Sequence, residues 1–336
     1  MPEPLHAPYR REMDTSVALV AGASRGLGLL IARELRDLGH TVVLCARERE
    51  ELDEASQLLD PSGEGVLTYV CDIAEAHSVA EMVRWIEAEV GPIEVAITVA
   101  GVIQVMPLEN TRLEHFEEAV DIMTFGPVHV ALAVVSGMRK RGRGRIGTIT
   151  SIGGAVSVPH LLPYSTAKFG AVGFSRGLSA ELAGTGITST TVVPGLMRTG
   201  SHLNARFGGD AVAEYAWFAP GASLPLLAMD AERAAERIVK GVLAGRNQVV
   251  LTPLAKIGMR VGGIAPSLTT TAMKVMARLL PSPSDGDKDP RTVAGHTARR
   301  RLSSPVVETL TALGTRAAHR FNQFDNNNSG STKGHA

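Results

Sequence analysis

The chain has 336 residues, of which 44% are hydrophobic and only 4% aromatic, so its length allows one large domain or two ordinary ones with an aliphatic core. Its formal net charge is zero, which argues against a nucleic-acid partner. Residues 1–14 carry prolines and charges but no apolar run, so we expect an N-terminal segment without a secretory signal. Cys45 and Cys71 each close an apolar run, and we expect two buried thiols in a cytoplasmic protein rather than a disulfide.

Short apolar runs alternate with helical periodicities as far as about residue 250. The helical segments include 76–90, 113–138, 166–183 and 231–244. Repeated strand–helix units predict one α/β domain over residues 15–252, with a doubly wound, Rossmann-like parallel sheet and helices on both faces. Ligands of such sheets bind beyond the carboxyl ends of the strands. The predicted strands are Val17–Ala21, Thr41–Leu44, Leu67–Cys71, Val95–Val99, Gly144–Ser151, Thr188–Val193 and Gln248–Leu251.

A glycine-rich turn joins the first predicted strand to a predicted helix, Leu29–Leu38. Its glycines let the backbone approach a pyrophosphate, and the helix N-terminus adds free N–H groups and the positive end of a dipole. The spacing is G-x-x-x-G-x-G, and a turn of this kind can also be purely structural. The turn consists of Gly22, Ala23, Ser24, Arg25, Gly26, Leu27 and Gly28.

A second motif carries acid–base chemistry. Tyr164 and Lys168 are four residues apart at the start of a predicted helix, so the phenol and the ammonium share one face. A free phenol has a pKa of about 10, and a nearby cation lowers that pKa. Ser151 ends the preceding predicted strand, and its hydroxyl is suited to hold a carbonyl oxygen. A lone serine or tyrosine is more often structural, but the three together beside a phosphate cradle favour catalysis on a carbonyl.

On these motifs the chain resembles the compact, single-domain branch of the short-chain dehydrogenase/reductase family, from about Thr15 to Leu251. The resemblance implies that Tyr164 is the general acid or base, that Lys168 binds the nicotinamide ribose, and that Ser151 polarises the carbonyl. It also implies homo-oligomers in which helices 113–138 and 166–183 pair between subunits. Further cofactor contacts implied by the resemblance are Asp72 at the adenine, Ala100 and Gly101 after the fourth strand, and Pro194, Gly195 and Thr199 at the nicotinamide carboxamide.

Two positions depart from the family pattern. Thr98 and Val99 replace the family's Asn-Asn pair, and Met123 stands where the catalytic asparagine is expected. That asparagine supports a water relay largely through its backbone carbonyl, which any residue supplies, so we expect an altered relay rather than loss of activity. The alternatives are a weakly active or non-catalytic NADP(H)-binding regulator and a membrane-surface lipid or steroid dehydrogenase.

The residues after the second predicted strand bear on the cofactor. No acidic residue follows Thr41–Leu44, and Arg47 lies there instead. Two guanidiniums, Arg25 and Arg47, converging on one point would suit a 2′-phosphate, although either arginine could be a solvated surface charge. We therefore predict NADP(H) in preference to NAD(H), and no metal.

The substrate is less well specified. Residues 196–227 should contain the substrate lid, which carries Phe207, Tyr215, Trp217 and Phe218. These rings predict an apolar carbonyl or alcohol substrate, unless they only pack the lid onto the core. His160 could line the same pocket or be an ordinary loop histidine.

The chain continues past the predicted domain as a helical extension. Residues 253–280 predict a helical arm, packed on the core or a second subunit, with an interfacial membrane contact as the alternative. Residues 281–303 are polar and predict a linker. Residues 304–324 predict a helix capped by Ser304, and residues 325–336 a disordered tail.

Overall fold

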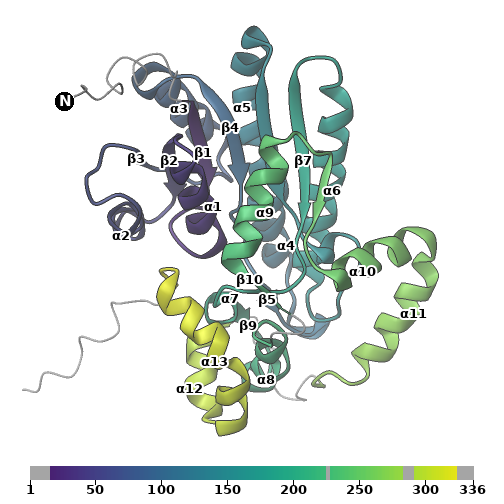
Figure 1. The fold of residues 1–336 in the computed structure, drawn as a ribbon. Helices are drawn as coiled ribbons and strands as arrows, with labels where there is room; N and C mark the ends of the chain where they lie inside the picture. Colours follow the sequence, from purple (N-terminus) through teal and green to yellow (C-terminus); the bar gives the residue numbers. More distant parts are fainter. Residues whose placement is uncertain (1–15, 225–227, 283–290, 324–336) are drawn as a thin grey trace, which may run out of the picture.

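The computed structural model describes residues 16–224, 228–282 and 291–323, and its ribbon is shown in Figure 1. A seven-stranded sheet of order β11-β7-β6-β4-β1-β2-β3 forms its centre, and all neighbouring strands are parallel. The order reverses between β1 and β4, which creates the crevice where such sheets bind ligands. The strands are β1 (Val17–Ala21), β2 (Thr41–Ala46), β3 (Val66–Val70), β4 (Ile93–Thr98), β6 (Gly144–Ile149), β7 (Ile187–Val193) and β11 (Gln248–Val250).

Helices cover both faces of the sheet, as predicted. Alternate residues of β1 enter two different cores, Ala18 and Val20 one and Val17 and Leu19 the other. This explains why the strands are continuous apolar runs, since both of their faces are buried. The first core is closed by α1 (Gly26–Asp37), α2 (Arg49–Leu59) and α9 (Ala231–Leu243), and the second by α3 (Ala76–Trp85), α5 (Gly126–Arg141) and α6 (Leu162–Glu181).

The predicted helices 76–90 and 113–138 are interrupted by π-helical turns. The first ends in η1 (Ile86–Val90), and the second consists of α4 (Leu113–Val120), η3 (Asp121–Phe125) and α5. Periodicity alone does not reveal a π-turn, because the turn inserts one residue without changing the composition of the helix. Within the described residues, Leu113–Arg141 is also the one helical stretch long and apolar enough to cross a membrane. It is weak evidence for a membrane span, because 44% of its most apolar part is buried in the protein.

A smaller layer lies beyond the carboxyl ends of the strands. Its third hydrophobic core contains Val105, Phe207 and Tyr215. The layer contains β5 (Gln104–Val105), η2 (Leu108–Asn110), η4 (Ile152–Gly154), β8 (Met197–Arg198), α7 (Ser201–Asn204), β9 (Arg206–Phe207), α8 (Ala211–Gly221) and β10 (Met229–Asp230).

The predicted arm is a pair of helices, α10 (Pro253–Ile264) and α11 (Pro266–Ala277), which projects from the body in Figure 1. Thr252 caps α10 by accepting the N–H of Ala255 at 3.1 Å. Ala255 is the one buried residue of α10, and α11 has none.

The predicted linker 281–303 is wrong for residues 293–302. They form β12 (Val293–Ala294), antiparallel to β9, and α12 (Gly295–Leu302), packed on α7 and α8. The segment docks through Gly295 and Ala298. Because these residues are small and contribute little to a hydrophobic pattern, the sequence shows no sign of a packed helix here. The last helix, α13 (Pro305–Arg320), starts after Ser304, whose hydroxyl accepts the N–H of Val307. The predicted segments 1–14 and 325–336, and residues 283–290 of the predicted linker, lie outside the described residues.

Candidate active site

The glycine-rich turn is folded so tightly that two of its positions have no room for a side chain. A Cβ on Gly22, whose φ is +90°, would lie 2.4 Å from the backbone nitrogen of Ala100, and one on Gly28 would lie 1.9 Å from the carbonyl oxygen of Gly22. Such contacts are far inside van der Waals distance, so the two glycines are required for the turn to reach the end of β4. The turn opens α1 at Gly26, whose own N–H donates to the carbonyl of Phe321, and the N-terminus of this helix is a candidate anion site.

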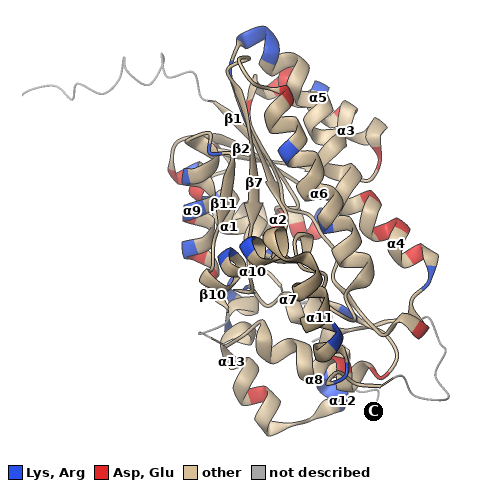
Figure 2. Cartoon of the chain, turned by 90° about the vertical axis from the view of Figure 1, so that its right-hand side faces the viewer, with Lys and Arg blue, Asp and Glu red and all other residues tan. Residues whose placement is uncertain are grey.

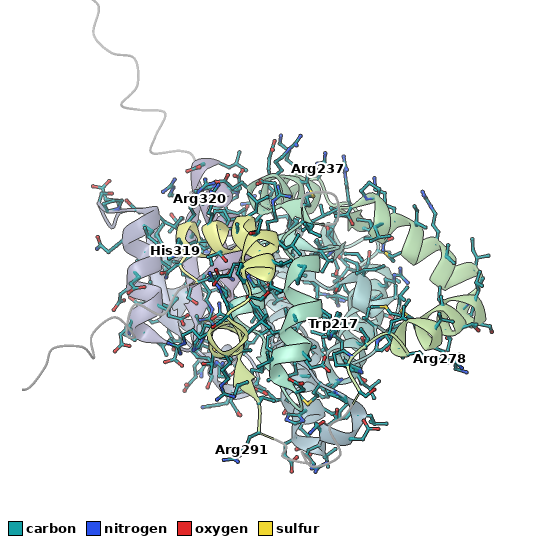
Figure 3. The ribbon with its side chains drawn as sticks, turned by 90° about the horizontal axis from the view of Figure 1, so that it is seen from below. Trp217, Arg237, Arg278, Arg291, His319 and Arg320 are labelled. Carbon is teal, nitrogen blue, oxygen red and sulfur yellow. The ribbon has the colours of Figure 1, made fainter. Side chains whose placement is uncertain are left out.

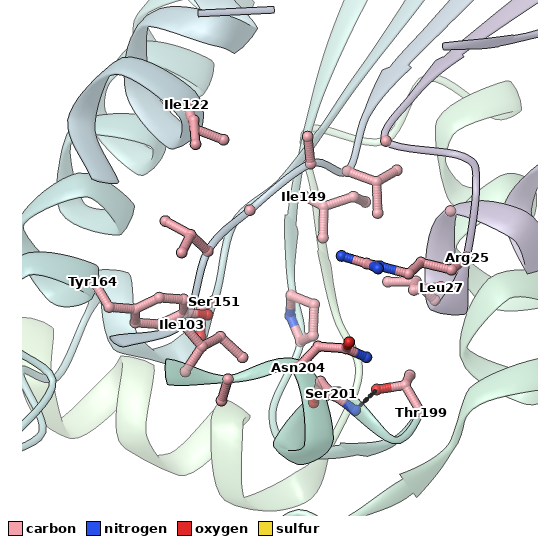
Figure 4. Close-up of a pocket in the computed structure, with 18 of the residues that line it drawn as sticks. Arg25, Leu27, Ile103, Ile122, Ile149, Ser151, Tyr164, Thr199, Ser201 and Asn204 are labelled. Carbon is pink, nitrogen blue, oxygen red and sulfur yellow. Dashed lines mark hydrogen bonds between the residues drawn. The ribbon is translucent and has the colours of Figure 1, made fainter. Parts of the chain in front are cut away.

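A cavity of about 430 Å³ runs from this turn across the carboxyl ends of the strands. Figure 4 shows Arg25 and Leu27 at one end and Ser151 and Tyr164 at the other. All but one of the predicted site residues line the cavity; the exception is Gly26, whose Cβ position is covered by the side chain of Gln323. The lining includes Gly22, Ser24, Arg25, Leu27, Gly28, Arg47, Asp72, Ala100, Gly101, Ser151, Tyr164, Lys168, Pro194, Gly195 and Thr199.

The predicted catalytic residues meet at Gly153. A Cβ on this glycine would lie 3.0 Å from the ring of Tyr164 and 3.4 Å from the Oγ of Ser151. Ser151 is held by the N–H of Gly153, which donates to its Oγ at 3.0 Å. Lys168 lies one helical turn after Tyr164, and its Nζ donates to the carbonyl of Ile149 at 2.9 Å. The structure therefore brings the three side chains together at the end of β6.

The electrostatics of this cluster correct one expectation. Burial raises the pKa of the Tyr164 phenol above its ordinary value, and a hydrogen bond with Ser151 opposes the rise. The predicted net lowering of the Tyr164 pKa is therefore wrong: burial outweighs the opposing effects. The Lys168 ammonium lies 5.8 Å from the centre of the phenol ring and donates to a backbone carbonyl. Burial also lowers the pKa of Lys168 to about 8, so it is charged at neutral pH and loses that charge in mild alkali.

Met123, which replaces the family asparagine, lies in the π-turn η3 and is buried. A Cβ on Gly101 would lie 3.2 Å from the sulfur of Met123 and 3.8 Å from Nζ of Lys168. The thioether thus contributes an apolar wall beside the lysine. A π-turn leaves the backbone hydrogen-bond ladder irregular, which is common near functional sites.

The two arginines of the predicted 2′-phosphate site are ion-paired rather than free to converge on one point. Arg25 contacts Glu51 at 2.6 Å, and Arg47 lies 3.8 Å from Asp72. Glu51 also accepts the hydroxyl of Ser24 at 2.8 Å. Glu51 is a site residue that the sequence analysis missed, because it lies in the first turn of α2 rather than directly after β2.

The remaining predicted cofactor contacts lie in turns that their own side chains stabilise. Asp72 accepts the N–H of Ala74 at 3.0 Å, and Thr199 accepts the N–H of Ser201 at 3.3 Å. Gly195 follows β7, and a Cβ there would lie 2.2 Å from the hydroxyl of Thr252. This segment therefore has a backbone fixed in position at the edge of the cavity.

Of the four lid aromatics, one lines the cavity, namely Phe218. Phe207 and Tyr215 are fully buried in the third core. Trp217 donates to the buried carboxylate of Glu214 at 2.6 Å. The structure therefore supports the interpretation that these three rings pack the lid onto the core rather than line the substrate pocket.

His160 ties the loop before Tyr164 to the lid. Its Nδ1 lies 2.8 Å from the carboxylate of Glu214 in α8, and its backbone has a φ of +63°. The residue lies outside the cavity that holds Tyr164, so its position corrects the view that it lines the substrate pocket. The sequence signal for such an anchor, a histidine far from its glutamate, is too weak to find without the fold.

One further lining residue, Gln323, comes from the extension beyond α13. Its place in the cavity was not foreseen, because 119 positions separate it from Asn204, with which it hydrogen-bonds.

The profile of the short chain dehydrogenase family matches residues 16–206. The chain belongs to this family. Among its relatives, a putative ketoacyl reductase of Streptomyces coelicolor is 37% identical over 188 residues, 55% of this chain and 72% of that protein. A fatty acyl-CoA reductase of Acinetobacter baylyi is 28% identical over a longer stretch, 84% of this chain and 91% of that protein. The crystal structure of an actinorhodin polyketide ketoreductase variant with NADPH superposes with a TM-score of 0.62 at 30% identity, covering 71% of this chain and 96% of that one.

A nicotinamide cofactor, as expected of a short-chain dehydrogenase, fits the residues present. Gly22 and Gly28 leave the turn without side chains where it packs closest to the backbone, and the cavity extends from Arg47 to Lys168. A dinucleotide is an elongated ligand with a pyrophosphate in its middle, so it needs this arrangement of a long cavity beside a helix N-terminus.

Proposed function

We propose that the protein is an NADP(H)-dependent oxidoreductase that interconverts a carbonyl and an alcohol on an apolar small molecule. The observation that carries the proposal is the cavity in which Ser151, Tyr164 and Lys168 share one space with the glycine turn. A structural role for these residues would not require a serine, a tyrosine and a lysine at the same end of a cofactor-sized cavity.

In the proposed reaction, each residue has a distinct task. Ser151 donates a hydrogen bond from its hydroxyl to the substrate oxygen and keeps its proton, while Tyr164 transfers its phenolic proton to that oxygen in reduction or takes the proton back in oxidation. Lys168 retains two N–H donors after its bond to Ile149, and these are available to ribose hydroxyls. The cofactor, when bound, supplies the hydride.

The test is consumption of NADPH with a panel of apolar ketones, aldehydes and quinones. Tyr164→Phe should lower turnover at least about 100-fold, since it removes the proton donor, while Tyr69→Phe, outside the cavity, should match wild type. Absence of turnover in both directions, with tight NADPH binding, would instead favour the non-catalytic regulator.

The preference for NADP(H) rests on Arg25 and Arg47 at the end of the cavity away from Tyr164. A 2′-phosphate would exchange the carboxylate partners of these guanidiniums for a bidentate phosphate. Arg47→Ala should weaken NADPH binding about tenfold while leaving NADH binding unchanged, with the exposed Arg246→Ala as control. Equal dissociation constants of wild type for NADPH and NADH would refute the preference.

A second candidate role, contact with an anionic membrane surface, is favoured by the arm of residues 253–280. The arm contains no aspartate or glutamate, and Figure 2 shows only basic residues coloured on α10 and α11. Six of its apolar side chains are more than half exposed, namely Leu254, Ile257, Ile264, Leu268, Val275 and Leu279. Exposed apolar groups beside cations are typical of interfacial helices.

Co-sedimentation of the full chain with lipid vesicles tests this role. We expect binding to vesicles that contain phosphatidylserine and little binding to vesicles of phosphatidylcholine alone. If equal amounts of protein stay in the supernatant with both lipids, the proposed membrane contact is refuted.

We also propose that the chain forms homo-oligomers through α4, α5 and α6. Leu132 of α5, Phe125 of the π-turn η3 between α4 and α5, and Phe169 of α6 are 68%, 47% and 46% exposed, and exposed large apolar groups are typical of interfaces. Light scattering should give a mass above that of one chain, and Leu132→Glu should reduce it to the monomer.

A further inference from the structure

The residues that end and follow α13, Ala318 to Gln323, lie against the glycine turn. The N–H of Gly26 donates to the carbonyl of Phe321 at 2.8 Å, and the side-chain amide of Asn322 donates to the carbonyl of Ser24 at 3.1 Å. Phe321 itself is buried in the core that α1 closes. This segment, the C-terminal strap, is thus anchored on one wall of the cavity.

The strap also contacts the opposite wall, which is formed by Thr199 to Asn204. The side-chain amide of Asn204 donates to the carbonyl of Gln323 at 3.2 Å. A Cβ on Gly200 would lie 2.4 Å from the Cβ of Ala318 and 2.8 Å from the Oε1 of Gln323. The strap therefore bridges the two walls.

Gln323 occupies the place where the walls approach each other. Its amide nitrogen lies 2.4 Å from the Cβ position of Gly26, and its oxygen faces Gly200, so the amide is wedged between two glycines with positive φ. That buried oxygen has no hydrogen-bond partner among the described residues. Gln323 also lines the cavity, beside the turn that presents N–H groups to an anion.

We propose that the C-terminal strap closes over the phosphate-binding part of the cofactor cavity and must open for the cofactor to enter and to leave. The inference rests on the proposed function, because it assumes that a dinucleotide occupies this cavity. The strap is held by hydrogen bonds at Gly26, Ser24 and Asn204 and by the buried side chains of Ala318 and Phe321. Its opening releases these contacts at the end of the chain and leaves the sheet intact. Exchange of cofactor would then be limited by this opening, as it is for other gated sites.

The test is stopped-flow measurement of NADPH association and dissociation by its fluorescence, with the full chain. Asn322 has a φ of +52°, so Asn322→Gly removes its amide without straining the backbone. In the double variant Asn204→Ala/Asn322→Gly, we expect both rates to rise about tenfold, with the dissociation constant nearly unchanged. The exposed Asn247→Ala, which touches neither wall, is the matched control.

The outcomes separate the two proposals. Failure of wild type to bind either NADPH or NADH overturns the proposed function and the strap with it. Binding by wild type with unchanged rates in the double variant overturns the strap alone. A rise in only one of the two rates also overturns the strap proposal. Faster dissociation alone would mean that the strap only contacts the bound cofactor, and faster association alone would mean that it competes with the cofactor for the site. If the double variant fails to fold, Asn204→Ala by itself is measured against the same outcomes.

Discussion

Two pairs of helices follow the sheet, and they differ in what they bury. The arm, α10 and α11, buries a single alanine. The second pair, α12 and α13, buries Thr311, Gly314, Ala317 and Ala318 and ends in the buried Phe321. Figure 3 shows the two pairs on different sides of the molecule, with Arg278 on the arm and Arg320 at the end of α13.

Helical periodicity therefore does not indicate which helices pack beside the candidate site. The arm is richer in large apolar residues, yet it leaves them exposed. The second pair docks through small residues on the lid helices α7 and α8, and close approach of backbones supplies its packing. The second pair therefore belongs to the cofactor region, whereas the arm offers an open surface.

The largest effect on stability is expected when one charged side chain is introduced into each pair of helices. Ala318 is fully buried against Gly200, so Ala318→Glu should lower the free energy of unfolding by about 3 kcal/mol or more. Val275→Glu on the arm, 55% exposed in wild type, should change it by less than about 0.5 kcal/mol. Urea titrations of both variants measure this, and equal losses would show that the arm is packed as tightly as α13.

The second effect concerns pH and the lid beneath α13. His202 is buried, and a Cβ on Gly314 would lie 2.7 Å from its ring. Burial, aided by Arg299, lowers the pKa of His202 from 6.5 to about 4. Below pH 6.5 the unfolded chain therefore binds a proton at His202 that the folded chain does not. We expect the free energy of unfolding to be highest above pH 6.5 and to fall by up to about 3 kcal/mol as the pH drops toward 4.

Thermal unfolding between pH 7 and pH 4 tests this linkage. His202→Met should flatten the pH dependence, while His77→Gln, with an exposed side chain, should retain the wild-type slope. An unchanged slope in His202→Met would assign the acid sensitivity to other groups.

The third effect is on the arm and concerns binding rather than stability. Lys274→Gln/Arg278→Gln should weaken binding to phosphatidylserine vesicles by about 2 kcal/mol, since each juxtamembrane cation contributes about 1 kcal/mol. The same change in charge at Arg139 and Lys140, which are exposed on α5, is the control. Equal weakening by both pairs would mean that net charge, and not the arm, determines binding.

The smallest effect is expected from an exposed ion pair that joins α13 to the sheet domain. Arg320 lies 3.1 Å from Glu232 of α9, and its side chain is 64% exposed. Arg320→Gln should lower the free energy of unfolding by less than about 1 kcal/mol, because water and salt screen such pairs. A loss as large as that of Ala318→Glu would show that charge, rather than close packing, holds α13 in place.

The sheet and the places of the candidate catalytic residues were predictable because their signals are local. Buried strands such as Val17–Ala21 are continuous apolar runs, and a glycine turn and a Tyr-x-x-x-Lys spacing bring chemistry to their carboxyl ends by the geometry of parallel sheets. These local signals are sufficient to predict the fold class and the places of Ser151, Tyr164 and Lys168 in it.

The partners of the site residues, in contrast, follow from tertiary contacts. The carboxylate of Glu51 on Arg25, the carbonyl of Ile149 on Lys168 and the amide of Gln323 at Gly26 come from segments distant in the chain. Likewise, α12 docks through Gly295 and Ala298, which have little hydrophobic signal. The physical reason is that spacing records which residues share a face of one helix or strand, whereas contact between distant segments depends on shape and close packing in three dimensions.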